Sequence, residues 1–193
     1  MIQQASAHIP LVWGNFKIIA YAESEKVENP HLVLIHDEMD KNEAISLRIH
    51  SECLTGDLLG SKRCDCGEQL SMSLKIIAEE KGMLIYLRQE GRGIGLINKL
   101  KAYNLQDKGL NTIEANIHLG FEADERHYDI AIKILNDLNI DKIKLITNNP
   151  DKIDAIEKSN IDLVDRIPII INAGKENQGY LDIKKEQMGH FLK

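Results

Sequence analysis

The chain has 193 residues, 28% of them charged, with a formal net charge of -6 at pH 7. This length suits one ordinary domain with a sizeable core, and the acidic balance argues against a broad surface for nucleic acid or an anionic membrane. The N-terminal stretch has no cationic segment followed by an apolar run, and no apolar stretch is long enough to span a bilayer. We therefore expect one cytoplasmic domain over residues 1–193 that binds neither nucleic acid nor membrane.

Apolar periodicity predicts strands that alternate with helices along the chain. We expect strands at 11–21 (as a hairpin or bent strand), 31–36, 45–50, 83–88 and 143–147, and one or two more at 162–172. We expect helices after Cys66-Gly67, at 96–107, around 131–138 and at 151–159. This order of elements predicts an α/β fold, a single domain with a mixed parallel and antiparallel sheet flanked by helices.

The strand at 45–50 leads into a loop that contains every cysteine of the chain. Arg48, His50 and Glu52 alternate with apolar residues, so they share one side of the chain as it enters this loop. The loop therefore receives a cation, an imidazole and a carboxylate. A solvated strand face explains Arg48 equally well.

The three cysteines, Cys53, Cys64 and Cys66, lie within fourteen residues, and a single Asp separates the last two. This spacing is poorly suited to a disulfide framework. Thiolates are good zinc ligands, and three of them leave a fourth position open for water, as in catalytic zinc sites. The alternative is three reduced thiols that pack as small hydrophobic side chains, which the charged flanking residues disfavour. The stretch predicts a metal site.

The sequence H-S-E-C at 50–53 has the H-x-E spacing of zinc-dependent nucleobase deaminases, in which a Glu transfers protons for zinc-bound water. The second half of that pattern, P-C-x-x-C, does not match, because only Asp65 separates Cys64 and Cys66 and no proline precedes them. The comparison supports a zinc-activated water near a base, but not membership of the deaminases.

A glycine-rich turn, Q-E-G-R-G-I-G-L, follows the strand at 83–88 and precedes a helix. Such turns bring backbone amides and a helix N-terminus to phosphate groups. Neither the dinucleotide-binding nor the P-loop pattern matches. A phosphate cradle and a plain tight turn both remain open, and Glu90 and Arg92 favour a functional role.

Two further pairs of polar residues lie next to predicted helices. Asp124 suits a helix N-cap, whereas Arg126 is electrostatically misplaced near a helix N-terminus unless it shares an anion with it. Thr147 and Lys152 follow a buried strand, at the sheet edge where open α/β proteins bind ligands. A solvated helix position is the alternative for Lys152.

Together, the strings R-I-H-S-E-C-L-T-G-D, R-C-D-C-G, R-Q-E-G-R-G-I-G-L, A-D-E-R and T-N-N-P-x-K resemble those of the GTP cyclohydrolase II family. The resemblance runs from about Pro10 to Leu192, with the motifs in the family's order. Bifunctional members carry a synthase domain ahead of this one, and a chain of 193 residues has no room for it. The resemblance therefore implies the stand-alone form.

The family resemblance implies a hydrolase that acts on cyclic amidine C–N bonds in the first step of riboflavin biosynthesis. The reaction opens the imidazole ring of GTP and releases formate and pyrophosphate, which leaves 2,5-diamino-6-(5-phosphoribosylamino)pyrimidin-4(3H)-one. The resemblance further implies one Zn²⁺ per chain, Mg²⁺ with the triphosphate, and a homodimer.

The same resemblance assigns roles to individual residues. Cys53, Cys64 and Cys66 would hold zinc, and Tyr103 would lie near the ring-opening step. Asp124 would be the proton acceptor, and Arg126 would be either a nucleophile towards the α-phosphate or a phosphate clamp. The implied GTP contacts are Arg48, Ile49, His50, Ser51, Glu52, Gln69, Glu90, Gly91, Arg92, Thr112, Thr147 and Lys152.

Three alternatives have different expected products or ligands. A relative could stop at the formylated intermediate, which retains the formyl carbon. Another zinc-dependent purine nucleotide hydrolase, such as a deaminase, would release ammonia in place of formate. A non-enzymatic zinc module that binds nucleic acid would need a fourth protein ligand and a basic face, which the net charge disfavours.

Overall fold

The computed structural model describes residues 1–171, 174 and 177–192, which form two compact units. The first, here called the sheet unit, comprises residues 1–50, 70–88 and 128–169. The second, here called the thiol unit, comprises 51–69, 89–127 and the described residues after 169. The backbone passes repeatedly from one unit to the other, so each unit is built from three separate stretches of sequence.

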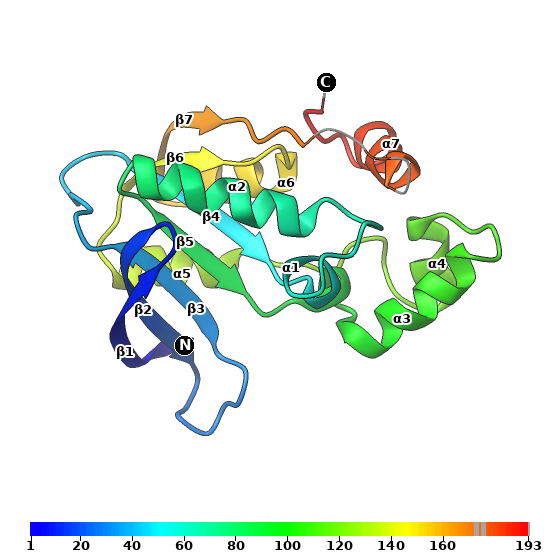
Figure 1. Cartoon of the computed structure of the whole chain (residues 1–193), viewed down its shortest axis with the longest axis horizontal. Coiled ribbons are helices and arrows are strands. Elements are labelled where there is room, and N and C mark those ends of the chain that lie inside the picture. Colours follow the sequence, from blue (N-terminus) through cyan, green and yellow to red (C-terminus); the bar gives the residue numbers. More distant parts are fainter. Residues whose placement is uncertain (172–173, 175–176, 193) are drawn as a thin grey trace. The chain divides into compact units, whose positions relative to one another are not determined.

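The sheet unit is built around a seven-stranded sheet with strand order β1-β2-β3-β5-β4-β6-β7 (Figure 1). The strands are β1 (Ile2–Leu11), β2 (Gly14–Ala22), β3 (His31–His36), β4 (Ile45–Ser51), β5 (Met83–Leu87), β6 (Lys142–Ile146) and β7 (Asp162–Ile167). β1, β2, β3 and β5 pair antiparallel in that order, whereas β4 with β6 and β6 with β7 pair parallel. The predicted mixed sheet is confirmed.

Helices cover both faces of this sheet: α2 (Cys66–Glu79), α5 (Asp129–Asp137) and α6 (Pro150–Glu157). Successive strand residues point to opposite faces. Leu84 packs in one apolar cluster with Leu74 of α2, whereas Ile85 packs in the other with Ile134 of α5 and Ile156 of α6. The part of α2 that belongs to the sheet unit therefore covers one face, and α5 and α6 cover the other (Figure 1).

The hairpin predicted at 11–21 is longer than expected, and its turn lies directly before Gly14. Its first strand starts at Ile2, and Leu11 pairs with Gly14 across Val12-Trp13. Most of β1 is exposed, so it lacks the apolar alternation that would identify it as a strand.

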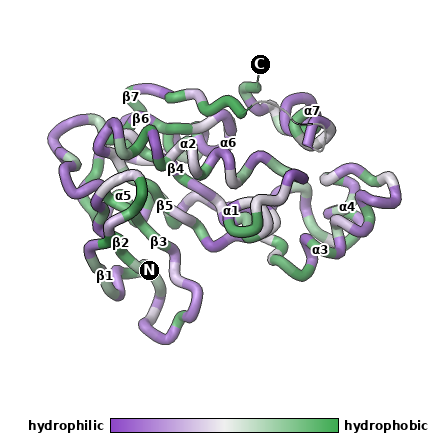
Figure 2. Tube along the Cα trace, viewed as in Figure 1, coloured by the Kyte–Doolittle hydropathy of each residue, from purple (hydrophilic) through white to green (hydrophobic). Residues whose placement is uncertain are grey.

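Hydrophobic residues line the inner strands, whereas the connection from β3 to β4 is hydrophilic (Figure 2).

The thiol unit consists of loops and short helices. Its helical elements are α1 (Leu54–Asp57), the first turn of α2, the 3-10 turn η1 (Glu90–Gly93), α3 (Gly95–Gln106), α4 (Thr112–His118) and α7 (Gln178–Glu186). The expected helices after Cys66-Gly67 and at 96–107 are confirmed. Within the described part of the chain, every helix is too short or too polar to cross a bilayer.

Helix α4 was not predicted, because its seven residues carry only a weak apolar pattern. A capping box starts it: the Asn111 side chain accepts hydrogen bonds from the Ile113 and Glu114 amides, and the Glu114 carboxylate accepts one from the Asn111 amide. This N-terminus places Thr112 at the first helical position.

Candidate active site

The three cysteines of the thiol unit converge on one point. Their Sγ atoms all lie within 4.8 Å of one another, and those of Cys53 and Cys64 are 3.6 Å apart. Cys53 immediately precedes α1, and Cys66 is the first residue of α2. Cys53 and Cys64 are buried and Cys66 is half-buried. The starts of α1 and α2, with the bend that carries Cys64, therefore hold three thiols at a spacing that one metal ion can bridge.

Glycines allow the loop to close tightly around the sulfurs. A Cβ atom at Gly56 would lie 3.0 Å from the Cys64 Sγ and 3.2 Å from the Cys53 Sγ. A Cβ atom at Gly67 would collide with the carbonyl oxygen of Gly56. These positions need glycine because backbone and sulfur atoms approach closely, which leaves the space beside the thiols for something small.

Protonation is unequal within the cluster. The pKa of Cys53 lies far below that of an ordinary thiol, because Cys64 and Cys66 donate hydrogen bonds to its sulfur and Lys99 adds a positive charge. The hydrogen bond to Cys53 raises the pKa of Cys64 to about 11, and hydrogen bonding to Cys53 also raises that of Cys66. A dication would replace the two remaining protons. Three convergent sulfurs fit zinc, a cation that favours thiolate ligands.

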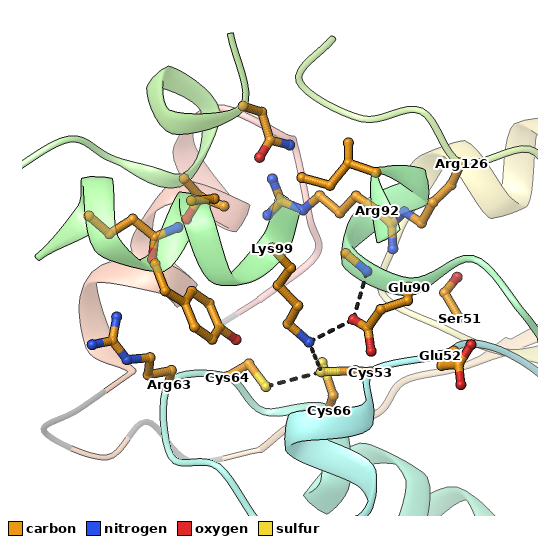
Figure 3. A pocket seen from close by; sticks show the side chains of 17 residues that line it. Ser51, Glu52, Cys53, Arg63, Cys64, Cys66, Glu90, Arg92, Lys99 and Arg126 are labelled. Atoms are coloured by element: carbon orange, nitrogen blue, oxygen red, sulfur yellow. Dashed lines mark hydrogen bonds and ion pairs between the residues drawn. The ribbon is translucent and has the colours of Figure 1, made fainter. Parts of the chain in front are cut away.

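Glu90 links the glycine-rich turn to the thiol loop. Its Oε2 accepts a hydrogen bond of 2.6 Å from the Leu54 amide, and its Oε1 accepts bonds of 2.7 Å from the Gly91 amide and from the Lys99 Nζ. The Lys99 Nζ also lies 3.1 Å from the Cys53 Sγ. Figure 3 shows this chain of contacts from Glu90 through Lys99 to Cys53.

The backbone of η1 is left-handed over three successive residues. Gly91, Arg92 and Gly93 have φ values of 64°, 61° and 94°, and a Cβ at Gly93 would approach the Glu125 carbonyl to 2.9 Å. For Arg92 this conformation is strained. The Gly91 amide donates to Glu90 and the Gly93 amide to the Gln89 carbonyl. Those two amides are thus engaged within the protein.

Asp124 and Arg126 form a compact ion pair. The Arg126 Nε donates to the two carboxylate oxygens at 2.8 and 3.0 Å, its Nη2 donates to Oδ2, and its backbone amide donates to Oδ1 at 3.0 Å. Burial favours a higher pKa for Asp124, but the hydrogen bonds and charge of Arg126, with the charge of Arg92, hold it below its usual value. The capping interpretation of Asp124 is wrong, because α5 starts only at Asp129, after Tyr128.

A cavity of about 90 Å³ opens over the thiols within the same unit. This volume is below the roughly 300–1,000 Å³ of typical ligand pockets. A second cavity of about 560 Å³ shares Arg63, Gln106 and Thr112 with the first and therefore adjoins it. Predicted residues that line the smaller cavity are Ser51, Glu52, Cys53, Cys64, Cys66, Glu90, Gly91, Arg92, Tyr103, Thr112 and Arg126.

Two predicted residues of the thiol unit, Gln69 and Asp124, do not line this cavity. The Gln69 amide donates a hydrogen bond of 2.6 Å to Asp65, the residue between two of the cysteines. The other Asp65 oxygen pairs with Lys184 of α7 at 2.6 Å, and both partners are buried. Gln69 therefore supports the loop that carries the thiols.

The remaining predicted residues, Arg48, Ile49, His50, Thr147 and Lys152, belong to the sheet unit and are all buried. The Arg48 guanidinium donates to the Ile146 carbonyl at 3.0 Å, and the Lys152 Nζ donates to the Ile49 carbonyl at 2.7 Å. The solvated positions considered for Arg48 and Lys152 are therefore wrong, since these side chains are only 4% and 5% exposed.

His50 and Thr147 also make defined contacts within the sheet unit. The His50 ring stacks on Tyr86 with centroids 5.5 Å apart, and the Thr147 hydroxyl accepts a hydrogen bond of 3.0 Å from the Asn149 amide. Asn149 in turn caps α6 through its side chain. These polar residues cluster around the ends of β4 and β6 in this unit.

Sequence reasoning missed Lys99 and Arg63, which also line the smaller cavity. Arg63 lies 4.9 Å from the centre of the Tyr103 ring and pairs with Asp107 at 2.6 Å. Lys99 precedes Tyr103 by four residues on α3, so one face of the helix presents both side chains. That spacing, directly after the glycine-rich turn, was the available signal for Lys99.

Comparisons with known proteins agree with the motifs. The model of the family described as GTP cyclohydrolase II matches residues 3–168. The chain is 53% identical over 193 residues to a GTP cyclohydrolase-2 of Buchnera aphidicola subsp. Schizaphis graminum, covering 100% of this chain and 98% of that protein. It is 50% identical over 189 residues to the GTP cyclohydrolase-2 of Picrophilus torridus, with 97% of each chain covered.

A longer relative is the riboflavin biosynthesis protein RibBA of Chlorobium phaeovibrioides. It is 46% identical over 194 residues, which cover 100% of this chain and 47% of that protein. The relatives of similar length and this longer one thus share the region in which the motifs and the thiol cluster lie. The chain belongs to the GTP cyclohydrolase II family.

Proposed function

We propose that this protein is a GTP cyclohydrolase II. It hydrolyses the imidazole ring of GTP and releases formate and pyrophosphate, and it serves riboflavin biosynthesis. Identity of about half of all residues with enzymes of that name supports the assignment over the full length of the chain. The observation that carries it is the convergence of three thiols in a cavity that Tyr103, Arg92 and Arg126 also line.

Cys53, Cys64 and Cys66 would hold one Zn²⁺. Zinc, when bound, would supply a water that is a competent nucleophile near neutral pH. The chain's own contribution is to hold the three sulfurs together and to keep the surroundings tight, as the close approach of Gly56 illustrates.

Tyr103 would act as a hydrogen-bond donor close to the thiols. Its hydroxyl lies 3.4 Å from the Thr55 Oγ1, which itself lies 3.8 Å from the Cys53 Sγ. Burial is the main cause that raises the pKa of Tyr103, so the phenol keeps its proton at neutral pH. Its role would be to donate a hydrogen bond from Oη to the opening ring.

Arg126 and Arg92 would bind the triphosphate. A guanidinium has a pKa above about 12 and is a poor nucleophile, and Asp124 is a weak base because its pKa is depressed. Proton transfer from Arg126 to Asp124 is therefore steeply unfavourable. We propose that Asp124 orients Arg126, which clamps the α-phosphate during pyrophosphate release.

Variants of Arg126 separate the clamp from covalent catalysis. Arg126→Lys retains measurable pyrophosphate release if the side chain supplies charge alone. Isolation of a phosphoramidate on Arg126 after acid-free quenching and mass spectrometry would exclude a role limited to clamping.

Several further features belong to this proposal through the family resemblance. Mg²⁺ would accompany the triphosphate of GTP and offset part of its negative charge, and the enzyme would act as a cytoplasmic homodimer. The other predicted GTP contacts would bind the base, the ribose and the phosphates. Analytical ultracentrifugation, with and without GTP and Mg²⁺, tests the dimer: a single sedimenting species of monomer mass under both conditions contradicts it.

The decisive experiment is anaerobic incubation of the zinc-loaded protein with GTP and Mg²⁺, with formate, pyrophosphate and ammonia measured together. We expect formate and pyrophosphate from the wild type, and loss of formate in Cys64→Ser. Ser71→Ala, an exposed change on α2, is the matched control and should keep both products.

The same assay distinguishes the other candidates. Pyrophosphate without formate, together with a formylated pyrimidine product, would identify an enzyme that stops at the formylated intermediate. Ammonia in place of formate would identify a deaminase. No turnover with fully loaded metal would overturn the proposed function and favour a non-enzymatic zinc module.

A further inference from the structure

We propose that Lys99 is a positioning residue of the metal centre: its ammonium donates a hydrogen bond to the Cys53 sulfur and, through Glu90, fixes the glycine-rich turn to the thiol loop. The proposed effect of Lys99 on metal binding rests on distances within the thiol unit. Only the catalytic readout rests on the proposed function.

The contacts of Lys99 are short and enclosed. Its Nζ lies 3.1 Å from the Cys53 Sγ and 2.7 Å from the Glu90 Oε1. The side chains of Lys99 and Glu90 are each 9% exposed, so bulk water screens the pair only weakly. Figure 3 shows the ammonium between the carboxylate and the sulfur.

An ammonium that is buried to this extent needs anions around it, because desolvation disfavours an isolated charge. Glu90 supplies one anion and the Cys53 thiolate supplies the other. With a dication on three thiolates, the sulfur site keeps one net negative charge, and Glu90 adds a second. Lys99 offsets one of these charges and lies within 3.1 Å of an atom of each anion.

A hydrogen bond to a thiolate draws electron density from the sulfur. The sulfur then donates less density to a metal ion, which stays a stronger Lewis acid, and the ligand is held in one orientation. Lys99 therefore tunes Cys53, the sulfur to which it donates. In the part of the chain that the structure describes, the Lys99 ammonium donates to the Cys53 sulfur at 3.1 Å.

Lys99 also couples this sulfur to the rest of the cavity. Its Nζ lies 5.9 Å from the centre of the Tyr103 ring, one turn further along α3. Glu90, held by Lys99, accepts hydrogen bonds from the amides of Leu54 in α1 and Gly91 in η1. The same ammonium thus fixes the position of α3, η1 and the thiol loop relative to one another within this unit.

The test uses the full-length protein loaded with Co²⁺, whose sulfur-to-cobalt charge-transfer band reports electron donation by the thiolates. In Lys99→Met we expect this band to move to lower energy while the tetrahedral d–d bands persist. Competition with a chelator should show metal affinity about 10- to 100-fold lower, the usual effect of losing a ligand's hydrogen-bond partner. Lys99→Arg, which keeps the charge, should recover most of the affinity and shift the band less.

Lys101→Met is the matched control, because Lys101 lies on the same helix but is exposed and bonds to Asn98. It should change neither the band nor the affinity. An unchanged band and affinity in Lys99→Met, with only a lower melting temperature, would overturn the proposal and leave Lys99 a structural partner of Glu90. If Lys99→Met does not fold, Lys99→Gln takes its place, with the same band shift expected and an unchanged band as the contrary result.

The catalytic readout is kept separate. With zinc and GTP, Lys99→Met should lower kcat for formate release about 10- to 100-fold, with KM changed far less, since the contact is to a metal ligand and not to the nucleotide. A band shift in a protein that releases no formate would refute the proposed function and leave the assignment of Lys99 intact.

Discussion

The sheet unit buries two clusters of aliphatic and aromatic side chains with a few charged residues such as Arg48, whereas the thiol unit buries cysteines and charged pairs beside single apolar residues such as Ile94 and Leu181. Both apolar clusters consist of sheet-unit residues, with fully buried members such as Leu47, Ile85 and Ile134. In the thiol unit the buried charged contacts are Glu90 with Lys99 and Asp65 with Lys184. Apolar burial stabilises without a partner ion, whereas buried charges need theirs. The thiol unit should therefore depend on ions much more strongly.

The largest effect should come from the metal. Chelation removes the expected dication, and Cys66→Ser removes one of its ligands. A loop that binds a metal ion is ordered by that ion, so both changes should disorder the thiol loop. Amide hydrogen exchange in 51–69 and 89–127 should rise strongly, and formate release should fall below detection. Amides of β3, β5 and β6 should stay protected. An equal loss of protection in those strands would show that the sheet unit depends on the metal ion as much as the thiol unit does.

Next in size is the buried pair between α7 and the thiol loop. Lys184→Met leaves the Asp65 carboxylate buried without its cation, which costs about 3–5 kcal/mol in comparable cases. Local stability at 61–69, measured by hydrogen exchange, should fall, and Asp65→Asn/Lys184→Met should recover much of it because no charge is then left unpaired. A double variant as unstable as the single one would show that the charge of the pair is not what matters.

The core of the sheet unit should respond globally. Leu47 is fully buried in the larger apolar cluster, so Leu47→Ala should lower the free energy of unfolding by about 2–5 kcal/mol. Urea denaturation followed by circular dichroism measures this loss. Cobalt binding at the thiols should change little under native conditions. A selective loss of metal affinity, with stability retained, would contradict the division of roles.

Acid should weaken the Asp124–Arg126 pair in a predictable direction. The pKa of Asp124 is depressed in the folded state, chiefly by Arg126 acting against the opposing effect of burial. The pair's contribution to stability is thus present above the unfolded pKa of about 3.9 and is lost as pH falls through the lower folded value. Asp124→Asn should flatten the stability profile below about pH 4, measured by urea denaturation, and an unchanged profile would show that the pair is not the source.

The smallest effect should come from an exposed pair in the sheet unit. Lys158 and Asp154 lie four residues apart with side chains 79% and 61% exposed. Lys158→Ala should change stability by at most about 0.5 kcal/mol, as measured by thermal melting in low salt. A loss comparable to that in Lys184→Met would mean that burial does not separate the two classes of ion pair.

Apolar periodicity predicted most of the sheet unit because each inner strand buries its side chains. The strands at 31–36, 45–50 and 83–88 lie within one residue of their predicted limits. The outer strand β1 was largely missed, since exposed residues leave no periodic pattern. The sequence also predicts a tight strand-to-helix turn at 89–95, but not that three successive residues there are left-handed.

The candidate site was predicted unevenly. The cysteines were recognisable because their spacing alone suits one metal ion, and the structure brings their sulfurs together. Lys99 was not, since a lysine on an amphipathic helix is usually solvated and its burial depends on a partner 46 positions away in the chain. The role of Asp65 was also hidden, because its partner Lys184 lies 119 positions away. Long-range ion pairs leave no local signal in a sequence.

Arg92 lies between two glycines in a backbone conformation that glycine adopts at little cost. Glycine at that position would relieve about 1–3 kcal/mol of strain, so selection for stability alone would favour it. An arginine there keeps a guanidinium in the lining of the cavity at a cost to the backbone. Efforts to make this protein more heat-resistant by repairing unfavourable dihedral angles should leave Arg92 unchanged, because the side chain that we propose to bind the triphosphate would be lost together with the strain.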